Sequence, residues 1–145
     1  MSMVDVTKKP EIFREATARG EIKLKVETIR LISEGKVEKG DVFSLAKVAG
    51  VLAAKKTCEL VPLCHPLPLS NIDVTLEIAD ENTVAAEATV KAFAKTGVEM
   101  EALTAVSTAL LTVWDMTKQY EKDREGQYPT TVIGEVKILS KVKKE

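Results

Sequence analysis

The only histidine of the 145-residue chain, His65, directly follows Cys64 in a proline-rich segment, with Pro62, Pro66 and Pro68 around it. Three prolines exclude a regular helix, and Pro66 biases His65 toward extended backbone. An imidazole held in a rigid loop can donate a hydrogen bond to a phosphate or a base edge. The alternative is a packed, structural histidine, and both interpretations stay open from these residues alone.

A second group of candidate residues is the run Lys95-Thr96-Gly97-Val98-Glu99-Met100-Glu101. Thr96 and Glu99 have the spacing of a capping box, and Glu101 suits the positive end of a helix dipole. That structural interpretation does not explain Lys95 or Met100. Exposed amides at a helix start that contains glycine also suit polar ligand groups. We therefore expect a helix start here, and ligand binding at it is the open alternative.

Asp115 and Lys118 are spaced to share one face of a helix. Most such pairs are solvated ion pairs that contribute little, but a pair partly desolvated at an interface can act as a tuned base and acid. A set of lysines precedes them: Lys36, Lys39, Lys47, Lys55 and Lys56. A solvated face is their default interpretation, although Lys39 precedes a glycine and a helix start, which suits phosphate.

Composition excludes several classes of function. A single histidine excludes zinc sites that need two or more, and a net charge of −1 gives no overall attraction to nucleic acid or to an anionic membrane. No apolar run approaches the ~18 residues of a membrane span. Cys58 and Cys64 have no metal or redox spacing, and the start has no signal-peptide core. We expect a cytoplasmic protein without a membrane or nucleic-acid partner.

The hydrophobic pattern predicts one domain over residues 1–145, with residues 1–10 and 143–145 flexible. It predicts strands over residues 13–24, 72–78, 84–92 and 132–142, and helices over residues 26–33, 41–57 and 98–120. Gly35 suits a helix C-terminus, and Gly50 indicates close packing. The order β-α-α-β-β-α-β predicts an α+β, ferredoxin-like split β-α-β fold, with an antiparallel sheet and helices packed on one face.

The longest predicted helix has no charge between Ala102 and Trp114. Because a domain this small rarely encloses such a helix by itself, we expect a subunit interface along it. Glu101 and Asp115 stand 14 positions apart on this helix, which is about 21 Å at 1.5 Å per residue. Both can serve one ligand only if the ligand is long or the site combines helix ends from two subunits. The expected interface favours the second arrangement.

Five runs in order carry a family resemblance: Lys39-Gly40-Asp41-Val42, Ala49-Gly50-Val51-Leu52-Ala53-Ala54-Lys55, Pro62-Leu63-Cys64-His65-Pro66-Leu67, Lys95 through Ala105, and Asp115-Met116. Together they closely resemble the cyclic pyranopterin monophosphate synthases, the molybdenum cofactor biosynthesis protein C family. The resemblance implies a lyase that rearranges a cyclised dihydro-GTP to a pyranopterin with a cyclic phosphate and releases pyrophosphate. It also implies a homohexamer, a trimer of dimers, with sites between subunits.

The resemblance also suggests roles for single residues. Asp115 resembles the catalytic aspartate, and Lys118 and Lys39 match lysines that act as acid/base or phosphate-stabilising groups. Positions matching substrate-binding residues are Leu63, Cys64, His65, Met100 and Glu101, with Glu99 and Arg14 as further polar positions. Many family members carry a glycine-lysine-rich tail, and we expect Lys141 to replace its phosphate contact here. We hypothesise Asp115 as base, Lys118 as acid and Lys39 near phosphate. No protein-bound metal is expected, and a divalent cation such as magnesium with the triphosphate is left open.

The alternative function is a non-catalytic ferredoxin-like module that binds a nucleotide or regulates another protein. RNA binding fits poorly, because Phe93 is the only aromatic residue that the alternating strands offer for base stacking. Fold alone does not separate an enzyme from a binding module, so the site residues must.

Overall fold

The computed structural model describes residues 1–145 and contains four strands and four helices. They are β1 (Ile12–Lys23), α1 (Val26–Ser33), α2 (Val42–Lys55), α3 (Thr57–Leu60), β2 (Leu69–Asp80), β3 (Thr83–Ala94), α4 (Glu99–Glu121) and β4 (Val132–Lys144). The strands form one sheet in the order β2-β3-β1-β4, with every neighbouring pair antiparallel. This is the ferredoxin-like arrangement, so the predicted fold class is confirmed. The short helix α3 is the one element that was not predicted.

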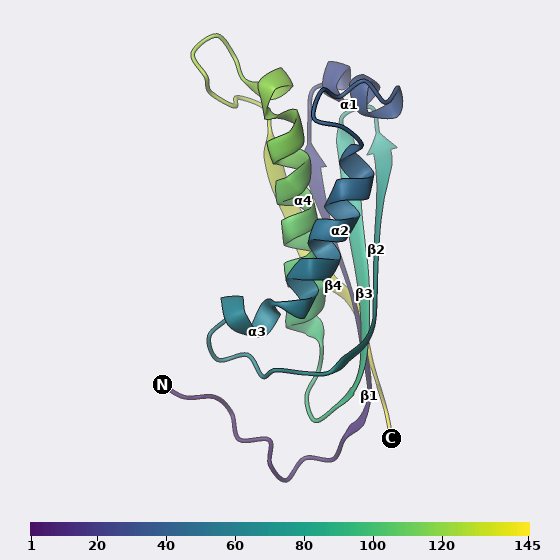
Figure 1. Cartoon of the computed structure of the whole chain (residues 1–145), viewed down its shortest axis with the longest axis vertical. Helices are drawn as coiled ribbons and strands as arrows, with labels where there is room; N and C mark the ends of the chain where they lie inside the picture. The colour runs from purple at the N-terminus through teal and green to yellow at the C-terminus, as the bar shows by residue number, and fades with distance from the viewer.

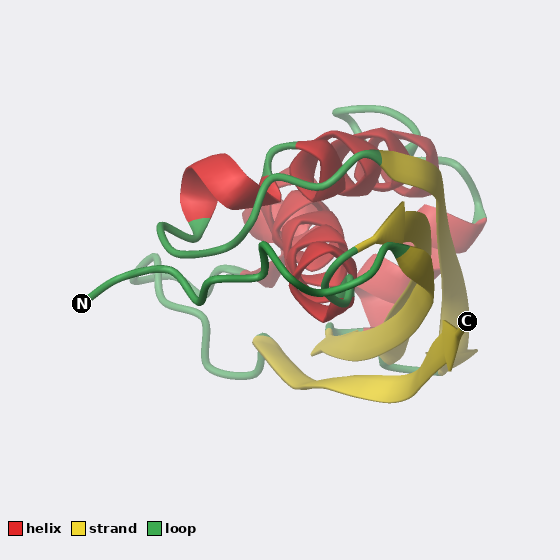
Figure 2. Cartoon of the chain, turned by 90° about the horizontal axis from the view of Figure 1, so that it is seen from below, coloured by secondary structure: helices red, strands yellow, loops and turns green.

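The two long helices, α2 and α4, lie side by side along one face of the sheet (Figure 1), and the sheet curves around the helices (Figure 2). Strand β1 alternates between buried and partly exposed residues along nearly its whole length. Its inward positions include Ala16 and Ala18, which are completely buried, as are Ala86 and Ala88 in β3. These small side chains let α4 lie close to the two central strands, and the core forms between them.

The predicted close packing at Gly50 is confirmed. A Cβ atom on Gly50 would lie 3.1 Å from the carbonyl oxygen of Ala105 in α4 and 3.2 Å from methyl groups of Val74 in β2. Helices α2 and α4 therefore approach each other through the missing side chain of Gly50. The predicted helix end at Gly35 is also confirmed, because Gly35 follows α1 with a φ of +68°.

The predicted capping box at Thr96 is wrong. With Thr96 as its N-cap the helix would begin at Gly97, but α4 begins at Glu99. Its N-cap is Val98, which makes no side-chain cap hydrogen bond. The physical reason is packing, because the side chain of Val98 is completely buried and fixes where the chain enters the helix. The side chain of Glu99 instead folds back over Gly97, where it occupies the space that a Cβ atom would need.

The outward side of the helix layer is largely uncharged. In α2, Leu45, Val48 and Leu52 are each about half exposed, and in α4 Leu111 is 59% exposed. An exposed apolar surface of this kind is typical of a contact between proteins. The subunit interface expected along α4 stays a prediction, and this surface is where the structure would place it. None of the helices has the length and apolar character needed to cross a membrane.

Candidate active site

Three of the predicted site residues meet at the C-terminal end of α4. The Lys39 ammonium donates to the Asp115 carboxylate at 3.1 Å and to the Asp115 backbone carbonyl at 3.0 Å. The Lys118 ammonium lies 3.1 Å from the other oxygen of the same carboxylate. Lys39 comes from the loop between α1 and α2, whereas Asp115 and Lys118 are both on α4. The sequence spacing therefore predicted the pair on α4, and the fold adds Lys39 to it.

The two ammonium groups control the charge of Asp115. The hydrogen bond from Lys39, followed by that from Lys118, holds the pKa of the Asp115 carboxyl below its usual value of 3.8. Asp115 is therefore ionised at neutral pH. All three side chains are exposed to solvent, beside a surface hollow of about 420 Å³ lined by Leu111, Trp114 and Ile133 with Asp115 and Lys118. The arrangement offers an anionic ligand two cations, with a carboxylate between them.

A second cavity, also of about 420 Å³, lies at the opposite end of α4. Its lining comes from the N-terminal segment, the proline-rich loop and the start of α4: Val4, Val6, Lys9, Val61, Leu63, Cys64, His65, Leu67, Thr96, Gly97, Glu99 and Met100. The structure thus brings together Leu63, Cys64, His65, Glu99 and Met100 around one cavity. Val4, Val6 and Lys9 also line this cavity and were not predicted, because the N-terminal segment gives no local sign that it folds against the start of α4.

His65 is fixed by the N-terminal segment. Its Nε2 atom lies 2.7 Å from the backbone carbonyl oxygen of Val4. Because a carbonyl only accepts, Nε2 carries a proton and donates in this contact. The Lys95 ammonium donates to the carbonyl of Thr7 at 3.1 Å and ties down the same segment. The His65 side chain therefore lines the cavity and is also held structurally, so the two interpretations of this histidine are compatible.

Cys64, which is partly buried, and Glu101, which is buried, are in contact next to this cavity. The Cys64 thiol donates to a carboxylate oxygen of Glu101 at 3.7 Å, and Glu101 is only 3% exposed. Burial, with the adjacent Glu101 charge, raises the pKa of the Cys64 thiol to about 11. Burial likewise raises the pKa of Glu101 above 4.5. A neutral thiol is a poor nucleophile, so Cys64 is suited to binding rather than to covalent catalysis. Glu101 itself does not line the cavity, but it accepts the hydrogen bond of Cys64, which does.

Arg14 and Lys141 support the start of α4 in different ways. Arg14 is 7% exposed, and its guanidinium donates to the backbone carbonyls of Ala94 and Lys95 at 3.3 and 3.1 Å. It does not line either cavity, and it fixes the segment that leads from β3 into α4. The Lys141 ammonium lies 3.5 Å from the Glu99 carboxylate. Lys141 therefore brings a cation from β4 to the edge of the second cavity.

The two groups of residues occupy opposite ends of one helix (Figure 1). Glu101 lies in the first turn of α4 and Asp115 near its end, which puts them about 21 Å apart. A ligand of nucleotide size cannot contact reacting groups at both ends within one chain. Each end carries part of the predicted site residues, and neither end carries all of them.

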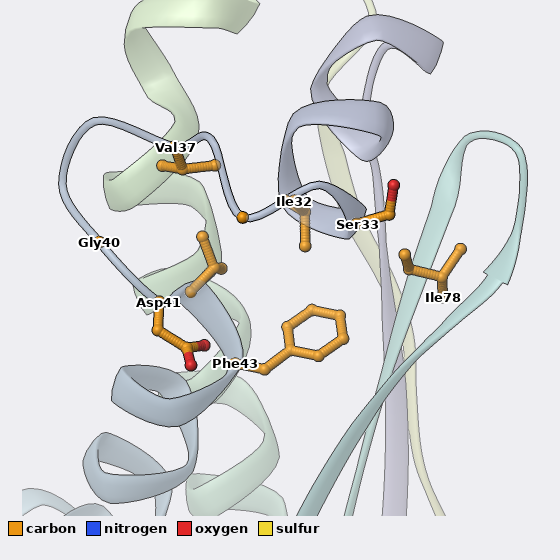
Figure 3. A pocket seen from close by; sticks show the side chains of 9 residues that line it. Ile32, Ser33, Val37, Gly40, Asp41, Phe43 and Ile78 are labelled. Carbon is orange, nitrogen blue, oxygen red and sulfur yellow. The ribbon is translucent and has the colours of Figure 1, made fainter.

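A further cavity, of about 570 Å³, lies elsewhere, between α1, the start of α2 and the end of β2. Figure 3 shows Ile32, Phe43 and Ile78 gathered around it. Its one carboxylate, Asp41, already accepts hydrogen bonds from the backbone amide and the hydroxyl of Ser44 as the N-cap of α2. The lining lacks free polar groups for chemistry, so the two smaller cavities on α4 are the better candidates. No three His, Cys, Asp or Glu side chains gather where they could hold one metal ion.

Comparison with known proteins identifies the family of the chain. The chain matches the MoaC family model over residues 3–144. It is 53% identical over 145 residues to "Probable cyclic pyranopterin monophosphate synthase" of Pyrococcus furiosus, covering 100% of this chain and 92% of that protein. It is 56% identical over 141 residues to a protein of the same name from Sulfolobus acidocaldarius, covering 97% of this chain and 98% of that protein.

A third relative carries a different name. "Probable cyclic pyranopterin monophosphate synthase accessory protein" of Methanothermobacter thermautotrophicus is 52% identical over 143 residues, covering 99% of this chain and 89% of that protein. The family match and the relatives all extend over nearly the whole chain, including both ends of α4. The chain therefore belongs to the MoaC family.

Proposed function

We propose that this chain is a cyclic pyranopterin monophosphate synthase, a lyase of molybdenum cofactor biosynthesis. Its substrate is a cyclised dihydro-GTP triphosphate, and its products are cyclic pyranopterin monophosphate and pyrophosphate. The names of relatives that are 53% and 56% identical support this activity. The observation that carries it is the Asp115 carboxylate held between the Lys39 and Lys118 ammonium groups, since the reaction needs proton transfers beside a phosphate chain.

In this proposal Asp115 is the general base and Lys118 the general acid. Asp115 is ionised and can take the proton of an attacking water or sugar hydroxyl. Attack of the sugar hydroxyl on the α-phosphate forms one P–O bond and breaks the bond to the departing pyrophosphate. Lys118 donates a proton where the purine imidazole ring opens. Lys39 stabilises the negative charge that develops on the phosphates.

The second cavity binds the rest of the substrate in this proposal. Leu63 and Met100 are both exposed and present apolar surface to a flat ring system. His65 and Glu99 add polar groups beside them, and Lys141 adds a cation at the edge. Cys64 completes the wall, with Glu101 behind it. Arg14 acts through the backbone before α4, as a positioning residue.

We further propose that one complete site combines the C-terminal end of α4 from one subunit with the N-terminal end of α4 from another. Because the two ends of α4 are about 21 Å apart in one chain, a second copy has to supply the other end. The uncharged outward side of α2 and α4 supplies a surface for association. The assembly expected from the family is a homohexamer, a trimer of dimers. In such an assembly each interface related by a two-fold axis creates two equivalent sites.

Any magnesium ion that accompanies the triphosphate is bound in this proposal by phosphate oxygens, because the chain offers no set of ligands for a resident metal ion. No step of the proposed mechanism depends on such an ion. We place the protein in the cytoplasm, since Cys58 and Cys64 are both free thiols and reduced thiols are typical of that compartment.

A second candidate function is a non-catalytic accessory protein, which the name of the Methanothermobacter thermautotrophicus relative favours. Such a protein would bind the nucleotide without converting it. The exposed Asp115 cluster argues against it, because binding a triphosphate gains nothing from a carboxylate placed between the two cations.

The test is release of pyrophosphate from the cyclised dihydro-GTP, measured for the unmodified chain, for Asp115→Asn and for Lys118→Ala. Lys122→Ala is the matched control, since it removes a lysine one turn beyond Lys118 that forms no ion pair. We expect release by the unmodified chain and by the control, and at least about 100-fold slower release by the two site variants. Absence of release by the well-folded unmodified chain would support the accessory function instead. Full activity in both site variants would overturn the assigned roles.

A further inference from the structure

The loop of residues 34–41, which carries Lys39, contains no helix or strand and is attached to α4 by specific contacts. The backbone amide of Glu38 donates to the hydroxyl of Tyr120 at 2.9 Å. The side-chain amide of Gln119 donates to the Glu38 carboxylate at 3.1 Å. Tyr120 and Gln119 belong to the last turn of α4, directly after Lys118. The residue before Lys39 is therefore held by two side chains of the helix that carries Asp115.

We propose that Tyr120 and Gln119 are positioning residues for the reaction: by holding Glu38 on α4 they keep the neighbouring Lys39 ammonium at the Asp115 carboxylate. This inference rests on the role given to Lys39 and Asp115 in the proposed function. It adds to that function two residues that touch neither the substrate nor the reacting atoms.

The Lys39–Asp115 ion pair is weak by itself. The Lys39 side chain is 44% exposed and that of Asp115 60% exposed, and an ion pair in water is worth little against the freedom of a four-carbon side chain. The backbone before Lys39 must therefore be fixed if the ammonium is to stay in place. Tyr120 is suited to this, because its ring is partly buried against the hydrophobic core and its hydroxyl is held in one position.

The backbone on both sides of Lys39 is constrained. Before it, the side chain of Val37 is 6% exposed and anchors the loop in the core. After it, Gly40 adopts a φ of +121°, which L side chains rarely adopt, and its amide donates to the carbonyl of Val37 at 3.1 Å. Because Tyr120 also holds Glu38, the backbone from Val37 to Gly40 is fixed against the end of α4.

The helix that leads into this loop is fixed to the same end of α4. The Glu121 carboxylate accepts from the backbone amide of Lys25 at 3.0 Å and from the hydroxyl of Thr28 in α1. It also accepts from the hydroxyl of Thr131, just before β4, at 2.6 Å. Residues 119–121 thus hold both α1 and the loop that follows it. Tyr120 acts on the part nearest to Lys39, so it is the residue to test.

The test compares Tyr120→Phe with Tyr128→Phe. Both substitutions remove one phenolic hydroxyl and keep the ring, and the chain has only these two tyrosines. The ring of Tyr128 packs against Trp114, but its hydroxyl forms no hydrogen bond. For each variant we would measure kcat and KM, the melting temperature, and hydrogen–deuterium exchange of the peptide that covers residues 34–41.

For Tyr120→Phe we expect kcat to fall about threefold to tenfold with KM unchanged. Exchange should become faster in residues 34–41 only, and Tyr128→Phe should match the unmodified chain in both measurements. Unchanged kcat overturns the inference, with or without faster exchange. Faster exchange throughout the chain with a lower melting temperature also overturns it, because the hydroxyl would then be merely structural.

Failure of the proposed function gives a different result. If Lys39→Ala releases pyrophosphate as fast as the unmodified chain, the role of Lys39 is wrong, and a kcat effect of Tyr120→Phe could not act through it. If Lys39→Ala is impaired and Tyr120→Phe is not, the proposed function stands and the positioning role fails. Gln119→Ala tests the second contact in the same way, with the smaller effect expected for a more exposed hydrogen bond.

Discussion

Lys39 and Asp115 are 76 positions apart in the sequence, yet the Lys39 ammonium donates to both the carboxylate and the backbone carbonyl of Asp115. The contact exists because the loop between α1 and α2 lies beside the C-terminal end of α4 (Figure 1). With Lys118 on the other side of the carboxylate, Asp115 has a cation on each of its two oxygens. This arrangement determines the protonation state of Asp115 and so the pH range in which it can act as a base.

Asp115 should stay ionised to a pH below 3.8, because the hydrogen bonds from Lys39 and then Lys118 lower its pKa. The favourable pairing is present above the unfolded value of 3.8 and is lost as the pH falls through the lower folded value. Replacing Lys39 with alanine should raise the pKa of Asp115 toward 3.8. A carbon-13 titration of the Asp115 carboxyl measures this shift, with Lys36→Ala as the control. An identical Asp115 titration in both variants would contradict the assigned contact.

The Cys64 thiol should be almost unreactive at pH 8, since its pKa is raised to about 11 by burial and by the neighbouring Glu101. Alkylation by iodoacetamide in a Cys58→Ser background, which leaves Cys64 as the only thiol, measures this. The rate should increase with pH up to about 11. Glu101→Gln removes the neighbouring negative charge and should make alkylation faster at pH 8. A fast reaction of Cys64 at neutral pH would show that its thiol is exposed or ionised.

Gly97→Ala should weaken substrate binding without unfolding the protein. A Cβ atom at Gly97 would take the space now filled by the Glu99 carboxylate, so Glu99 would move away from Lys141 and the cavity. We expect KM to rise about threefold or more, with little change in melting temperature. Gly134→Ala is the control, because nothing lies within 4 Å of its added Cβ atom. Equal KM values in both variants would exclude Glu99 from the binding site.

Glu121→Ala should destabilise the protein strongly. Glu121 is completely buried, and its carboxylate accepts from the amide of Lys25 and from the hydroxyls of Thr28 and Thr131. Leaving two buried hydroxyls and one part-buried amide without a partner should cost about 3 kcal/mol or more of unfolding free energy. Urea denaturation measures this cost, with the exposed Glu81→Ala as the control. Equal stability of the two variants would mean that water replaces the carboxylate without penalty.

The fold could be predicted from the sequence because local signals agree with each other. Alternation in β2 and β3 and the helical spacing that follows Asp41 each determine one element. The start of α4 was predicted to within one residue, but the capping box at Thr96 was not formed, because the burial of Val98, a tertiary effect, makes Val98 the N-cap. The short helix α3 has only four residues, too few for a periodic signal.

The candidate site was predictable only in part. The i, i+3 spacing predicted the Asp115–Lys118 pair, but nothing local predicts that Lys39 reaches it. Arg14 was expected in the binding site. Nothing in the sequence indicates that its guanidinium donates instead to the backbone carbonyls of Ala94 and Lys95. Tyr120 gave no sequence signal, because a tyrosine at the end of a helix is usually only a packing residue.

The claim that two copies of the chain share one site is tested most directly by complementation between variants. Asp115→Asn damages the C-terminal end of α4, and His65→Ala damages the cavity at the opposite end. Each variant alone should release pyrophosphate slowly. Co-expressed in equal amounts, the two should recover about a quarter of the unmodified activity, because about half of the dimers are mixed and each mixed dimer keeps one intact site of two. Activity of the mixture no higher than that of either variant alone would contradict the shared site.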